Sequence, residues 1–169
     1  MYRPMHRSVG LFAAIAIFVT GQGIAVGHLA PAGGWPWPVT GPVIRAFDPP
    51  ASPYAAGHRG IDIGAPAGST VSAPSPGVVY FAGLIGSDIF LGIDHGGGLR
   101  TTYSWLNGLP VAKGQTVTTG QPIAYSGWGH PSDPQPSLHF AVKLNGQYVD
   151  PLSYLLPLQI TDLIRLAPL

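Results

Sequence analysis

Short apolar runs, interrupted at close intervals by glycine and proline, are the feature that most limits how this chain can fold. Glycine (24) and proline (19) together make up about a quarter of the 169 residues. The segments between them are rich in β-branched and aromatic residues, as strands are. Outside the first 32 residues, no long segment carries a helical period. We therefore predict an all-β fold, a single antiparallel β-sheet or sandwich of short strands over residues 43–155.

The turn residues predict where these strands pair. A turn over residues 95–98, His95 followed by three glycines, should join a strand over 89–94 to one over 99–105, and Asn145-Gly146 should close a hairpin after 137–144. Residues 68–81 and 113–125 share a plan of short strand, turn with Gly or Pro, and second apolar strand. Each of these two segments is therefore predicted to form a hairpin.

Composition excludes several classes of function. Hydrophobic residues make up 46% of the chain, enough for one domain with a core. Only 9% of residues are charged and the net charge is +1, so there is no electrostatic case for a nucleic-acid partner. The chain has no cysteine, which excludes disulfides, thiolate metal sites and a lipid-modified cysteine.

The ends of the chain carry other signals. Arg3 and Arg7 precede an apolar run over residues 11–19, so residues 1–32 are predicted to be a signal peptide or an uncleaved N-terminal anchor. Either alternative places the domain outside the cytoplasm, secreted or in the cell envelope. Residues 33–42 are predicted to be a Pro/Gly linker, whose tryptophans could dock on the domain or stay tethered. Residues 156–169 are predicted to be a C-terminal tail.

A histidine and an aspartate near one strand are candidate metal ligands. If residues 57–63 are extended, alternation puts His58, Gly60 and Asp62 on one face. A third ligand, His139, would come from another strand and leave one tetrahedral position open, as in a catalytic zinc site. The competing interpretation is a surface ion pair between His58 and Asp62, with His139 bonded to backbone, because short patterns of this kind occur often by chance.

Four longer runs in the same order carry a family resemblance. They are GHRGIDIGAPAGSTVSAPSPGVVYFAG, DHGGGLRTTYSWL, VAKGQTVTTGQPIAYSG and SLHFAVKLNGQYVDPLSYL. Together they resemble the lysostaphin-type (LytM-like) zinc metallopeptidases, which cut peptide cross-links of peptidoglycan and have a duplicated hybrid-motif fold. Active members carry two further histidines, at positions that here hold Trp105 and Ser137.

The resemblance implies one Zn²⁺ per chain, bound by His58, Asp62 and His139, with peptidoglycan as the partner. It marks Ser137 and Trp105 as degenerate catalytic positions, because neither side chain accepts a proton near neutral pH as imidazole does. His95 and His130 are possible substitutes, with exposed-turn or loop histidines as the plainer interpretation. A cleft lined by Trp105, His130 and Ser137 is expected to bind the substrate.

Two functions follow from the resemblance. The first is an exported zinc endopeptidase-family domain acting on peptidoglycan cross-link peptides, with weak or lost activity. The second is a non-catalytic module that binds peptidoglycan or regulates a separate cell-wall amidase. A structural envelope domain, with a metal that only stabilises it, is a third possibility.

Overall fold

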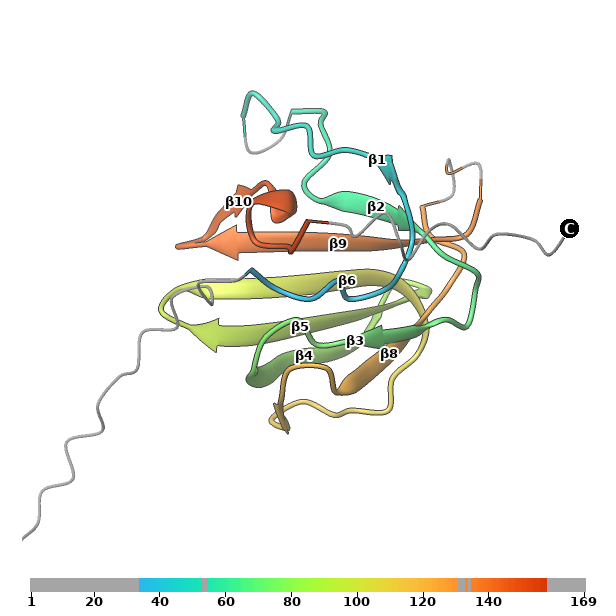
Figure 1. Cartoon of the computed structure of the whole chain (residues 1–169), viewed down its shortest axis with the longest axis vertical. Coiled ribbons are helices and arrows are strands. Elements are labelled where there is room, and N and C mark those ends of the chain that lie inside the picture. The colour runs from blue at the N-terminus through green and yellow to red at the C-terminus, as the bar shows by residue number, and fades with distance from the viewer. Residues whose placement is uncertain (1–33, 53–54, 131–132, 134, 158–169) are drawn as a thin grey trace, which may run out of the picture.

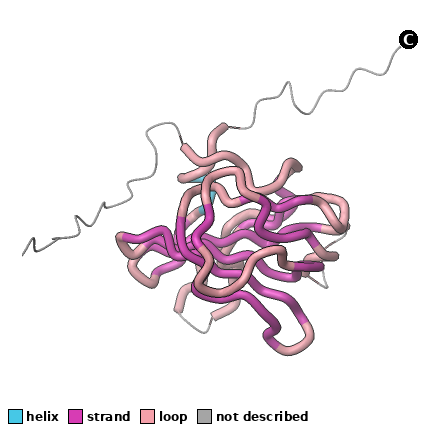
Figure 2. The backbone as a smooth tube through the Cα atoms, turned by 90° about the horizontal axis from the view of Figure 1, so that it is seen from below, coloured by secondary structure: helices cyan, strands magenta, loops and turns pink. Residues whose placement is uncertain are grey.

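The computed structural model describes residues 34–52, 55–130, 133 and 135–157. Within these ranges the chain forms ten strands and one short 3-10 helix, and Figure 2 shows how strands dominate the domain. The all-β prediction is confirmed. The elements are β1 Val43–Arg45, β2 Ile61–Gly64, β3 Thr70–Ser72, β4 Gly77–Ile85, β5 Asp88–Gly96, β6 Leu99–Gly108, β7 Thr116–Val117, β8 Pro122–Ser126, β9 Ser137–Leu144, β10 Gln147–Val149 and η1 Pro151–Ser153.

The strands form one mainly linear sheet in the order β1-β2-β9-β6-β5-β4-β7, in which neighbours are antiparallel (Figure 1). The β5–β6 and β9–β10 hairpins lie where their glycine turns predicted them. The two other predicted hairpins are wrong, because their strands exchange partners. β3 pairs with β8, and β7 pairs with β4, so the two similar segments interlock instead of folding back on themselves.

The segment before β1 is part of the domain and not a linker over its described residues. Trp35 is completely buried and packs its ring 5.4 Å from His95 and 5.0 Å from Tyr154. Backbone hydrogen bonds join the Trp35 N–H to Tyr154 O and the Leu156 N–H to Trp35 O, at 2.6 and 2.7 Å. In Figure 1 this blue segment crosses in front of β6. The buried indole therefore covers one face of the sheet.

Strand alternation gives the sheet two different faces. Leu91, Ile93, Tyr103 and Phe140 are buried on the face that Trp35 covers, and they form the hydrophobic core. Residues between them, such as Gly92, Thr102, Ser104 and His139, line a pocket on the other face. The core supports the sheet from one side and leaves the opposite side for a site.

The predictions for the signal or anchor (residues 1–32) and for most of the tail concern residues outside the described ranges. Among the described residues, no helix is long and apolar enough to span a membrane.

Candidate metal centre and adjoining groove

The three predicted ligands come together at the boundary between β2 and β9. Asp62 and His139 are directly paired across these strands, so their side chains share a face. His58 precedes β2 and is held by a two-way backbone bridge, in which the His58 and Asp48 N–H groups each donate to the other residue's carbonyl at 2.7 and 2.9 Å. Local pairing therefore positions all three.

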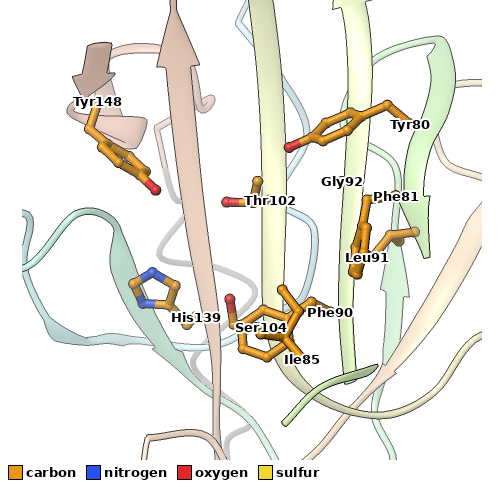
Figure 3. A pocket seen from close by; sticks show the side chains of 10 residues that line it. All are labelled: Tyr80, Phe81, Ile85, Phe90, Leu91, Gly92, Thr102, Ser104, His139 and Tyr148. Atoms are coloured by element: carbon orange, nitrogen blue, oxygen red, sulfur yellow. The ribbon is translucent and has the colours of Figure 1, made fainter. Parts of the chain in front are cut away.

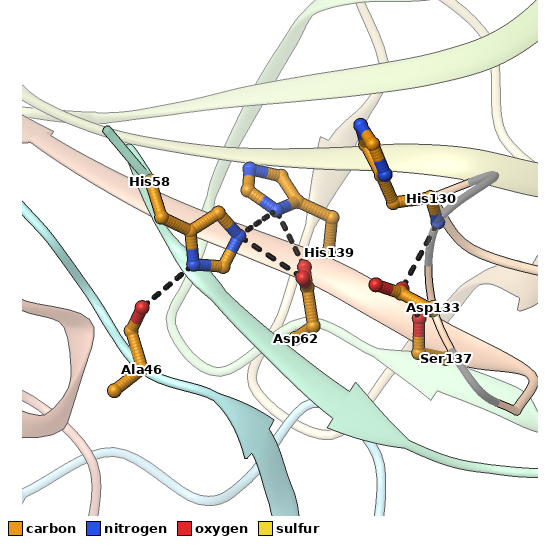
Figure 4. Close-up of polar contacts among 7 residues, drawn as sticks. All are labelled: Ala46, His58, Asp62, His130, Asp133, Ser137 and His139. Atoms are coloured by element: carbon orange, nitrogen blue, oxygen red, sulfur yellow. Dashed lines mark hydrogen bonds and ion pairs between the residues drawn. The ribbon is translucent and has the colours of Figure 1, made fainter. Parts of the chain in front are cut away.

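Their ligand atoms form a compact group (Figure 4). His139 Nδ1 lies 2.7 Å from Asp62 Oδ1, His58 Nε2 lies 3.1 Å from Asp62 Oδ2, and the two imidazole nitrogens lie 3.1 Å apart. One donor atom from each residue falls within 4.8 Å of the others. Two imidazole nitrogens and a carboxylate in this arrangement suit a divalent transition metal.

The hydrogen bonding around His58 supports a cation at this point. His58 Nδ1 lies 2.7 Å from the carbonyl oxygen of Ala46, which only accepts, so Nδ1 carries the proton and Nε2 presents a lone pair. That lone pair faces Asp62 Oδ2, a buried oxygen with no hydrogen-bond partner. A metal ion between them would replace this repulsion with two bonds, so the residues present fit the ion. The Ala46 carbonyl would act as the outer partner that fixes the ring.

Charge at the centre also depends on these histidines. Burial alone would raise the pKa of the Asp62 carboxyl, but the hydrogen bond and charge of His139 hold that pKa below its ordinary value. Asp62 is therefore an anion at neutral pH, which is the form that binds a metal.

Gly60 allows His139 to approach β2. A Cβ at this position would lie 2.9 Å from His139 Nε2 and Cε1, and 2.4 Å from the carbonyl oxygen of Phe140. Any side chain here would push His139 away, so the glycine between His58 and Asp62 is a requirement of the site.

Trp105 reaches the metal side through an irregularity in β6. Ser104 already lines the groove, so strict alternation would send Trp105 into the core. Instead, Trp105 adopts a φ of 56°, which is unusual for a bulky residue. Its ring lies edge-on to two imidazole rings. The ring centres are 5.4 Å apart for His139 and 5.0 Å apart for His130. The indole thus packs beside the ligand cluster.

Ser137, expected to line the substrate cleft, is instead completely buried. Its hydroxyl donates to Asp133 Oδ2 at 2.5 Å, and the His130 N–H donates to the same oxygen at 3.1 Å. Gly129 packs so closely on Ser137 that a Cβ there would overlap its hydroxyl. Ser137 and Asp133 therefore hold the loop that carries His130. Sequence reasoning missed Asp133, whose only signal was its position four residues before Ser137.

His95 lies on the wrong face of the sheet to serve as a replacement base. Its side chain is buried in the core face beside Trp35, with Nδ1 2.7 Å from Pro76 O and Nε2 2.8 Å from Thr101 Oγ1. Gly92 lines the groove, so His95, three residues along β5, points away from it. This placement removes His95 as a candidate.

A groove of about 430 Å³ opens directly beside His139 (Figure 3). Tyr148 lies on the side of His139, Thr102 and Ser104 form the floor, and Tyr80 and Phe90 lie on the opposite side. Sequence reasoning missed both tyrosines, because only the sheet order brings β4 and β10 to one groove.

Fold and donor set together define an antiparallel β domain with a His/Asp/His group that could hold a divalent metal beside an open groove. The family follows from comparison: residues 56–151 match peptidase family M23, and the chain belongs to this family. The predicted resemblance to lysostaphin-type enzymes is confirmed.

Several known proteins are similar over the same region. The Escherichia coli protein named uncharacterized lipoprotein YgeR is 36% identical over 73% of this chain and 47% of its own length. The murein hydrolase activator NlpD of Salmonella typhimurium is 34% identical over 75% of this chain and 32% of its own. A zinc containing peptidase from Vibrio cholerae superposes with a TM-score of 0.63 at 28% identity, over 73% of this chain and 41% of that one. The chain thus matches less than half the length of these relatives.

Proposed function

We propose that this chain is an envelope domain that binds one zinc ion and a peptidoglycan peptide, with little or no turnover. One observation carries the proposal. The three ligand side chains converge around an unpartnered carboxylate oxygen, while the two positions beside them lack a group that could accept a proton.

The surroundings of these two positions support low turnover as part of the proposal. Ser137 is buried, and its hydroxyl already donates a hydrogen bond to Asp133. Trp105 offers only an indole N–H and packs against His139. A positioned general base typically contributes about 100-fold to 10,000-fold to a rate, so its loss leaves binding largely intact and turnover slow.

The retained residues still support binding. Zinc held by His58, Asp62 and His139 would supply Lewis-acid polarisation of a carbonyl oxygen. Ala46 O keeps His58 Nε2 available for the ion. The groove beside His139 offers an aromatic and hydroxyl-lined surface for the rest of the peptide.

A second candidate function is activation of a separate cell-wall amidase. The relative named murein hydrolase activator supports it, because that name describes a protein that acts through another enzyme. The export-like first residues of this chain, and the lipoprotein names of relatives, support an envelope location. This chain has no cysteine, so lipid attachment through cysteine is not part of the proposal.

Metal analysis and co-sedimentation test the proposal. We expect about one zinc per chain after purification without chelator, and loss of that zinc in Asp62→Asn, which keeps the size of the side chain but removes its charge. The zinc-loaded chain should co-sediment with purified peptidoglycan sacculi and release few peptides from them. A protein that takes up no zinc and does not co-sediment with sacculi would refute the proposal.

Restoring an imidazole tests whether slow peptide release comes from the missing base or from a site that no longer functions. We expect Trp105→His to raise chelator-sensitive release of peptides, since histidine tolerates positive φ better than tryptophan does. Trp105→Phe is the matched control, because it also removes the indole but adds no base. Ser137→His, added to Trp105→His, completes the family's pair but must displace the loop packed on Ser137. Brisk release by the unmodified chain would instead make His130 the working base.

A further inference from the structure

The sheet face that carries the groove beside the metal centre continues along β6 and β9 to a pair of basic residues. Three cross-strand pairs share the face that carries His139, because alternate residues of a strand share a face. At about 3.3 Å per residue, the last pair lies roughly 13 Å from the first. In order from the metal centre, the pairs are Ser104 with His139, Thr102 with Ala141, and Arg100 with Lys143.

Two tyrosines flank this path at the far end. Tyr80 packs against Gly92, where a Cβ would fall 2.4 Å from the Tyr80 ring. Tyr148 is paired with Lys143 across β9 and β10, so it stands on the same face. Figure 3 shows both phenol groups directed into the groove around Thr102. The hydroxyls of Tyr80, Tyr148 and Thr102 make no hydrogen bond to another residue in the part of the chain that the structure describes. All three are therefore available to a ligand.

The tyrosines also hold the two cations. Arg100 Cζ lies 5.0 Å from the centre of the Tyr80 ring, and Lys143 Nζ lies 4.3 Å from that of Tyr148. Asp94 Oδ2 pairs with Arg100 Nε at 2.9 Å. Lys143 has no carboxylate partner among the described residues, so this end keeps a positive charge of one from two cations and one anion.

We propose that the tyrosine end of the groove, formed by Tyr80 and Tyr148 with the adjoining Arg100 and Lys143, binds a carboxylate of an extended peptide. The peptide would lie along β6 and β9, with a carbonyl at the metal centre and an acidic group about four residues away, since an extended chain advances about 3.3 Å per residue. Lys143 supplies the charge, and the tyrosine hydroxyls supply hydrogen bonds to the carboxylate or the neighbouring amides. This inference rests on the proposed peptide-binding function. It adds that the peptide has a fixed direction along the groove and must carry an acidic group.

The test compares sacculi with free carboxylates and sacculi whose carboxylates have been amidated with carbodiimide and ammonia. We expect the zinc-loaded full chain to bind the untreated sacculi about threefold to tenfold more tightly. Lys143→Gln and Arg100→Gln should each reduce that preference. The matched control is Lys113→Gln, which changes net charge equally at an exposed residue outside the groove. Thermal unfolding confirms that each variant folds.

The outcomes distinguish failure of the carboxylate site from failure of the proposed function. Equal binding of both kinds of sacculi would overturn the carboxylate site and leave the proposed function standing. An equal loss in Lys113→Gln would show that only overall charge matters, and would also overturn it. Binding to neither kind by zinc-loaded protein would overturn both proposals.

Discussion

Replacing Gly60 with alanine tests the geometry of the metal centre most directly. The new Cβ would sit 2.4 Å from Phe140 O and 2.9 Å from two ring atoms of His139. The carbonyl belongs to a paired strand and cannot rotate away, so β2 and β9 must separate locally. The distance between His139 Nδ1 and Asp62 Oδ1, which is 2.7 Å, would then increase.

Two opposing effects set the size of the change. Removing a glycine stiffens the unfolded chain, which stabilises a protein by about 0.4 to 1 kcal/mol when the site has room. Overpacking costs about 1 to 3 kcal/mol, so the clash wins and the metal-free protein should be less stable. Moving a ligand's support typically lowers metal affinity about 10-fold to 100-fold. Zinc-dependent stabilisation should therefore fall by about 1.4 to 2.8 kcal/mol.

Thermal unfolding with and without zinc measures both effects. At about 4 °C per kcal/mol for a domain of this size, the zinc-induced rise in Tm should shrink by about 6 to 11 °C in Gly60→Ala. Gly108→Ala is the matched control, because it lies in a strand and its Cβ would meet its nearest neighbour, Tyr125 Cδ2, at an ordinary 3.5 Å. If Gly60→Ala keeps the full zinc-induced rise, then His139 does not bind the metal as the structure places it.

Two further predictions concern the core. Trp35→Ala should lower the free energy of unfolding by about 3 to 5 kcal/mol in denaturant titrations, because the buried ring leaves a cavity. Trp35→Phe should cost clearly less, since the indole N–H is buried without a partner; a cost as large as that of alanine would contradict this. Burial raises the pKa of Tyr103, so its folded form favours the neutral phenol, and stability present below about pH 10 should be lost as pH rises further. Tyr103→Phe should reduce that alkaline loss, whereas Tyr125→Phe, at an exposed tyrosine, should not.

The fold class follows from local sequence, and the strand partners do not. Glycine turns of two or three residues bring adjacent strands together, which is why the β5–β6 and β9–β10 hairpins were predictable. The similar segments around β3 and β7 also have turns, yet β3 pairs with β8 and β7 with β4. That exchange is decided by packing across the whole sheet, which no local pattern records.

The residues around the site show the same division. Sequence by itself supplied the ligand types, because two histidines and an aspartate are chemically suited to a metal wherever they meet. Only the pairing of Asp62 with His139, 77 positions apart in the chain, brings them together. Strand parity then decides that His95 faces the core, and a β6 irregularity turns Trp105 toward the metal. Side-chain direction depends on register, and register is a property of the assembled sheet.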